Sequence, residues 1–149
     1  MRQVEKKVIL EKNQFLLSVL CFLVVAGLLA DLSCGNARYR LNEESAALSM
    51  KSIRSAERKF FTTDGKGRYG TLGELGIAGL IDSKLATGIK DGYQFEIRVE
   101  GASFKATAIP VEYDRTGSWS FYMNESGVLR GTSRSGNSAN SQDPPVRYQ

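Results

Sequence analysis

The sequence contains no histidine, only two cysteines and only three prolines. Without histidine, the chain lacks the side chain that most often serves as a general base or a metal ligand near neutral pH. No serine, threonine or cysteine stands in a motif that would activate it as a nucleophile. We therefore expect a protein that is not an enzyme, with no catalytic residues, no cofactor, no bound metal and no small-molecule substrate.

The cysteines give no firm indication of the redox compartment, and the distribution of charge argues against a nucleic-acid partner. Cys21 and Cys34 would lie about 20 Å apart on one helix, which is too far for a disulfide bond. The net charge is +4 and the pI is near 9.1, but basic and acidic residues are interspersed along the chain. This pattern indicates a mixed, solvated surface and no nucleic-acid partner.

One apolar run, from Phe15 to Ala30, carries no charged residue. As a helix, residues 15–32 would extend roughly 27 Å, close to the thickness of a bilayer core. We predict a transmembrane helix over 15–32, which also serves as the assembly helix. Its large apolar residues are Phe15, Leu16, Leu17, Val19, Leu20, Phe22, Leu23, Val24, Val25, Leu28 and Leu29.

Residues 1–14 form a basic leader, which is expected to keep the N-terminus in the cytoplasm. The predicted location is the inner membrane, as a single-pass protein with a periplasmic or extracellular head. We favour a retained anchor over a cleaved signal peptide because no small-residue cleavage site follows the run. A third alternative is lipidation at Cys34, although Asp31 stands where a lipoprotein signal has an apolar residue.

A second helical pattern, amphipathic in character, covers residues 36–61. Glu57 falls among the charged residues that we assign to its solvent-facing side. The two helical segments form either one continuous helix or two helices with a hinge at Gly35. The apolar stripe of the second segment is expected to pack on a sheet. Its packing residues are Ala46, Ile53, Ala56 and Phe60.

Glycine-rich residues 62–92 connect this helix to strands. Thr71 and Glu74 have capping-box spacing, which predicts a short helix, and Asp82 is placed to cap another turn. Alternation of apolar and polar residues then predicts a meander of four antiparallel strands. The expected strands cover residues 93–100, 103–109, 118–123 and 128–130.

The predicted fold is α+β, with a long N-terminal helix, half membrane segment and half amphipathic, packed on this four-stranded meander. The expected head covers residues 33–131. Residues 132–149 lack a periodic apolar pattern, so we expect a flexible tail.

Two groups of side chains are candidate binding sites. The loop carboxylates could meet on a calcium ion, but ordinary solvated acids are favoured because no Asp-x-Asp ligand loop occurs. Among the aromatic residues, Trp119 and Phe121 are expected in the core, which leaves Tyr113 and Tyr122 as exposed candidates for partner binding. The carboxylates in question are Glu112, Asp114 and Glu125.

This order of elements resembles the architecture of type IV pilins and pseudopilins. Stretches of the second helix (42–57), the connector (69–95) and the last hairpin (119–130) are similar to those of a pilin-like group, so the similarity covers roughly residues 36–131. The resemblance implies a subunit of a type IV pilus or type II secretion assembly that inserts by its N-terminal helix. Its partners would be the membrane and other pilin-like subunits, in a homo-oligomer or hetero-oligomer.

The leader departs from this family. Residues 6–11 contain no glycine, so no prepilin peptidase site is recognisable. The alternative function is a stand-alone extracytoplasmic binding domain, anchored in the membrane or lipidated, with a pilin-like head.

Overall fold

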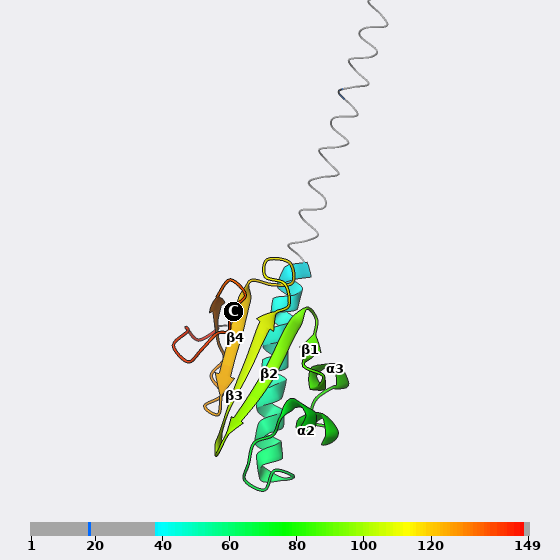
Figure 1. Cartoon of the computed structure of the whole chain (residues 1–149), viewed down its shortest axis with the longest axis vertical. Coiled ribbons are helices and arrows are strands. Elements are labelled where there is room, and N and C mark those ends of the chain that lie inside the picture. Colours follow the sequence, from blue (N-terminus) through cyan, green and yellow to red (C-terminus); the bar gives the residue numbers. More distant parts are fainter. Residues whose placement is uncertain (1–17, 19–37, 148–149) are drawn as a thin grey trace, which may run out of the picture. The chain divides into compact units, whose positions relative to one another are not determined.

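The computed structural model describes Ser18 and residues 38–147 (Figure 1). The chain divides into two units, Met1–Ala37 and Arg38–Gln149, and the second unit contains the elements given below. A long helix covers residues 38–62. The shorter elements that follow are α2 (Leu72–Ile77), α3 (Ser83–Ala86), β1 (Ile89–Lys90), β2 (Tyr93–Glu100), β3 (Ser103–Pro110), β4 (Trp119–Asn124) and β5 (Arg130–Ser133).

The five strands form one antiparallel sheet in the order β1-β2-β3-β4-β5. β2 and β3 pair along their whole length, from Tyr93 opposite Pro110 to Glu100 opposite Ser103. β1 is much shorter and pairs only with the first two residues of β2. The regular alternation in β2 places its apolar side chains on one buried face and its charged side chains in solvent.

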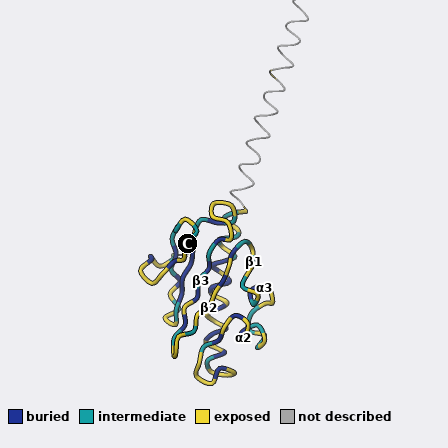
Figure 2. Tube along the Cα trace, viewed as in Figure 1, coloured by how far each residue is buried: buried dark blue, intermediate teal, exposed yellow. Residues whose placement is uncertain are grey.

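The long helix lies across one face of this sheet and buries the side that faces it (Figures 1 and 2). The four predicted packing residues lie in the core, and none is more than 4% exposed. They share the core with Phe95, Phe104 and Phe121 of the sheet and with Leu75 of α2. Burial of this apolar surface is the main force that holds the helix on the sheet.

The predicted fold class is wrong in two respects. The sheet has five strands, because β1 was not predicted and the last strand lies at Arg130–Ser133 instead of 128–130. The helix that the structure describes covers residues 38–62, which matches the predicted amphipathic half, and no apolar membrane half belongs to it among the described residues. No helix in the described part of the chain has the length and hydropathy needed to cross a bilayer. The predicted transmembrane segment, except Ser18, and Cys34 lie outside the described residues.

The segment after β5 packs against the sheet. The Gly131 amide donates to the Pro144 carbonyl at 3.1 Å, and the Val146 amide donates to the Leu129 carbonyl at 2.9 Å. Asp143 is 5% exposed and forms an ion pair with Arg134. The region expected to be a flexible tail therefore includes the end of β5 and a segment bonded to its edge.

The capping box at α2 is confirmed. The Glu74 amide donates to the Thr71 hydroxyl, and the Thr71 amide donates to the Glu74 carboxylate at 2.8 Å. The Asp82 cap is confirmed as well, because its carboxylate accepts from the Leu85 amide at 3.0 Å.

Removal of the first cap should weaken the fold. Thr71→Ala is expected to lower the free energy of unfolding by about 1 kcal/mol, the usual cost of losing a side chain at a helix N-cap. Thr71→Ser keeps the hydroxyl and should stay close to the wild type. Denaturant unfolding of the three proteins checks this, and equal losses for both variants would show that the hydroxyl is not the cause.

Candidate functional site

The outer side of the long helix carries two exposed leucines. Leu41 is 65% exposed and Leu48 is 53% exposed. Their spacing of seven residues places them on the same side of the helix, two turns apart. Apolar side chains in this position are not needed by the core of their own head. They are available for contact with another molecule.

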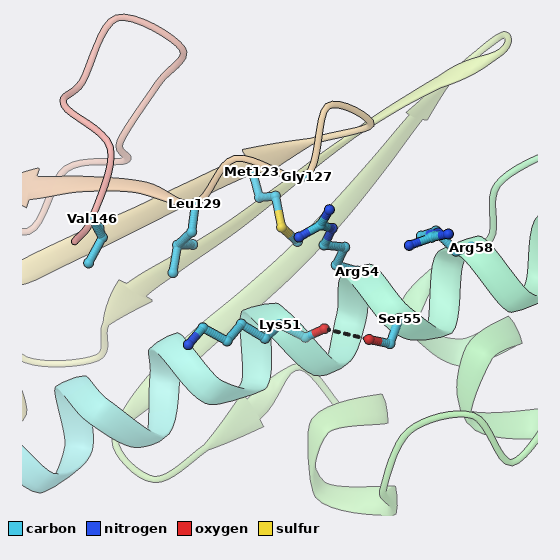
Figure 3. Close-up of a pocket in the computed structure, with 8 residues that line it drawn as sticks. All are labelled: Lys51, Arg54, Ser55, Arg58, Met123, Gly127, Leu129 and Val146. Atoms are coloured by element: carbon cyan, nitrogen blue, oxygen red, sulfur yellow. Dashed lines mark hydrogen bonds between the residues drawn. The ribbon is translucent and has the colours of Figure 1, made fainter. Parts of the chain in front are cut away.

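Beside this surface, a groove of about 430 Å³ runs between the long helix and the sheet. The helix contributes Lys51, Arg54, Ser55 and Arg58, which lie on successive turns of one side. The sheet and the C-terminal segment contribute an apolar floor, as Figure 3 shows. The floor consists of Met123, Leu129 and Val146, with Gly127 at its end. We call this set of eight residues the basic groove.

The two arginines of the basic groove are exposed, and Arg54 lies over Gly127. Gly127 has a positive φ of 71°, and a side chain there would overlap the Arg54 guanidinium, which occupies the space above the glycine. Within residues 38–147, neither Arg54 nor Arg58 forms an ion pair. Glu125 belongs to the same turn as Gly127 but does not pair with them. The groove therefore presents positive charge above an apolar surface.

A loop that covers residues 111–117 lies at the other end of β4. Hydrogen bonds within the loop fix its shape, including Thr116 N to the Glu112 carbonyl at 2.9 Å and Asp114 N to the Gly117 carbonyl at 3.0 Å. The long helix is bonded to the loop, since Asn42 Nδ2 donates to the Thr116 carbonyl at 3.0 Å. We call these residues the acidic loop.

The acidic loop alternates apolar and acidic residues on the surface. Val111 is 52% exposed and Tyr113 is 39% exposed, while Glu112 and Asp114 are exposed acids. Glu112 pairs with Arg115 at 2.6 Å, but both side chains are more than half exposed to solvent. Such an exposed pair contributes little to stability and leaves the carboxylate accessible.

Glu43 joins the helix to the start of β4. One of its carboxylate oxygens accepts from Ser118 N at 2.8 Å and from Trp119 N at 3.1 Å. Nearby, the buried Tyr93 hydroxyl donates to the Trp119 carbonyl at 2.8 Å. Burial raises the pKa of Tyr93 above its ordinary value. These bonds fix the residues that directly follow the acidic loop to the long helix and to Tyr93.

Glu57 was predicted on the solvent side of the helix, and this is wrong, because its side chain is 0% exposed. It turns inward because one carboxylate oxygen accepts from the Gly70 amide at 2.9 Å, which ties the helix to the connector. The other oxygen has no partner among the described residues. Burial raises the pKa of Glu57 to about 7, and the charge of Glu74 adds to the shift.

In β4, the burial of Trp119 and of Tyr122 is the reverse of the prediction, whereas Phe121 lies in the core as expected. Trp119 is 39% exposed, whereas Tyr122 is only 8% exposed. Tyr122 points to the outer face of the sheet, where it lines a shallow hollow together with Ser138 and Ala139 of the C-terminal segment. That segment covers a face that the sequence pattern assigns to solvent. Tyr113 is exposed, as expected.

The candidate calcium ligands Glu112, Asp114 and Glu125 do not form a site. Within the part of the chain that the structure describes, no group of three His, Cys, Asp or Glu side chains is arranged to hold a metal ion. Sequence reasoning missed Leu41, Leu48 and the basic groove. The leucines had a signal in the sequence, two apolar residues one heptad apart on a charged side of a helix.

Comparison with known proteins gave no match: no family model covers the chain, and no curated protein or solved structure is similar to it.

Proposed function

We propose that this protein is a non-enzymatic, pilin-like or pseudopilin-like subunit of a type IV pilus or type II secretion type assembly. It is anchored in the inner membrane by residues 15–32, with its head outside the cytoplasm. The observation that carries the proposal is the exposed pair Leu41 and Leu48 on the outer side of the long helix. An assembly subunit needs apolar helix surface beyond what its own core uses.

Other features support the same function. The sequence places an apolar run, residues 15–30, a few residues before the long helix that begins at residue 38. The absence of histidine from the whole chain argues against the commonest acid–base and metal chemistry.

A photo-reactive amino acid at position 48 tests the proposal in membranes. We expect cross-links from position 48 to a second copy or to another pilin-like subunit, because this leucine would lie in the contact. Ile77 is the matched control, since it is an exposed apolar residue of α2 and is 91% exposed. A probe at position 77 should give few cross-links. If neither position cross-links to another subunit, the assembly role is wrong.

The second candidate is a stand-alone anchored or lipidated binding domain. The basic groove favours it, because a single head already has a hollow of about 430 Å³. Mass spectrometry of the native N-terminus separates a lipidated protein from an anchored one and from a processed prepilin. A diacylated Cys34 indicates the lipoprotein, and an intact Met1 excludes prepilin processing. A head that stays monomeric in membranes would favour this second function.

A further inference from the structure

We propose that the basic groove of one copy binds the acidic loop of a second copy, so that the heads associate head to tail. The proposal deepens the assembly function above and rests on it. The exposed leucines of the helix indicate that subunits touch, whereas the groove and the loop are the two surfaces of the head that would meet.

The first argument is charge. The groove presents Lys51, Arg54 and Arg58 along one side of the helix, and the two arginines have no acidic partner within residues 38–147. The loop presents the carboxylates of Glu112 and Asp114 at the surface, and Glu112 also pairs with the exposed Arg115 at 2.6 Å. Opposite charges on two surfaces speed their encounter and fix their register.

The second argument is the apolar surface between the charges. The floor of the groove is formed by Met123, Leu129 and Val146. In the loop, Val111 and Tyr113 are exposed beside the acids. A surface that combines an apolar centre with a charged rim is typical of protein interfaces, and a tyrosine is a common anchor at such a centre.

The third argument is rigidity. The acidic loop is fixed by its own hydrogen bonds and by Asn42 of the long helix. In the groove, Arg54 is packed against Gly127. Because the loop and the buried floor residues Met123 and Leu129 are already fixed, their contact loses less conformational entropy than the ordering of a flexible segment would.

The geometry of such a contact is heterologous. The loop is fixed at Asn42, whereas the groove is centred near Arg54, and these residues are roughly 18 Å apart along the helix. A twofold dimer would need two reciprocal contacts at once, groove to loop and loop to groove, whereas a single contact repeated in one direction generates a ring or an open filament.

Charge reversal in the full-length chain tests the proposal in membranes. A photo-reactive amino acid at position 113 of one tagged copy should cross-link to the groove residues of a second copy with a different tag. Arg54→Glu/Arg58→Glu in the receiving copy should reduce this cross-link by about tenfold or more. When Glu112→Lys/Asp114→Lys is added to the probe copy, the cross-link should recover, because the charges are opposite again.

The control changes the same amount of charge outside the groove. Lys59→Glu/Lys66→Glu alters two exposed residues of the helix and the following turn, and it should leave the cross-link unchanged. Circular dichroism of each variant verifies that the head is folded. The proposal is overturned if groove reversal has no effect, if reversal of both surfaces gives no recovery, or if position 113 cross-links elsewhere.

The probe at position 48 separates this proposal from the assembly function. If position 48 cross-links to a second copy and position 113 does not, the groove contact is wrong and the subunit role stands. If neither position cross-links, both are wrong. Capture of a different acidic protein in the groove would also overturn the second copy as the occupant.

Discussion

Replacement of Glu57 by glutamine is expected to stabilise the head above pH 7 and to flatten the dependence of its stability on pH. The folded state raises the pKa of this buried carboxyl from 4.5 to about 7. Between these values the folded protein binds more protons than the unfolded chain, so the stability is highest below pH 4.5 and falls as the pH rises to 7. Over this range the wild type should lose at most about 3 kcal/mol.

Glutamine keeps the carbonyl oxygen that accepts from the Gly70 amide, but it carries no charge. At pH 8, Glu57→Gln should therefore be about 1–2 kcal/mol more stable than the wild type, because a buried and ionised carboxylate with one unpartnered oxygen is costly. At pH 5, where the wild-type carboxyl is neutral, the two proteins should be nearly equal in stability.

Urea unfolding of the full chain in detergent between pH 5 and pH 8 measures the effect. Glu125→Gln is the control, since Glu125 is an exposed carboxylate. In the connector, the hydrogen bond with Arg68 lowers the pKa of Glu74 to about 2, and the hydrogen bond with Lys90 lowers the pKa of Asp82, so neither carboxyl titrates in this range. A wild type and a Glu57→Gln variant with the same slope against pH would contradict the assignment.

Replacement of Gly117 by alanine is the second large effect, and it should cost about 2–4 kcal/mol of folding free energy. Gly117 is buried, and a Cβ atom there would overlap the Tyr93 hydroxyl and lie 2.8 Å from Tyr93 Cζ. Tyr93 is 0% exposed and cannot move without losing its hydrogen bond to Trp119 and disturbing the core.

A double-mutant cycle tests this cause. Tyr93→Phe removes the overlapping hydroxyl, so Gly117→Ala should cost clearly less in that background. Gly73→Ala is the matched control, because a Cβ atom there meets nothing closer than 4.0 Å and α2 gains a better helix former. Thermal unfolding of the four proteins of the cycle and of the control measures the losses. Equal costs of Gly117→Ala in both backgrounds would contradict the overlap.

The features predicted correctly from sequence depend on neighbouring residues. Alternation alone gives β2 at Tyr93–Glu100, and the spacing of Thr71 and Glu74 gives the cap of α2. β1 was not predicted because a strand of two residues, Ile89–Lys90, has no periodicity to detect. Local pattern is therefore sufficient for the long strands and the caps.

The errors arose where distant segments meet. Glu57 is charged in sequence, but its position is decided by the Gly70 amide thirteen residues later. Tyr122 lies on the polar side of its strand, but it is buried near Ser138 and Ala139 of the C-terminal segment. The basic groove likewise joins residues from the helix, the β4–β5 turn and position 146. No window of sequence contains such a set.

The short length of β1 has a consequence for how the head can associate. β1 leaves the side of β2 beyond Phe95 without a pairing strand among the described residues, so backbone groups of the sheet edge stay open there. Glu96, Arg98 and Glu100 are exposed along this edge, with Glu96 and Arg98 paired at 2.8 Å. Charged side chains on an open edge oppose the addition of a foreign strand. The head is thereby protected against strand-to-strand aggregation, and its side-chain surfaces are left to select its neighbours.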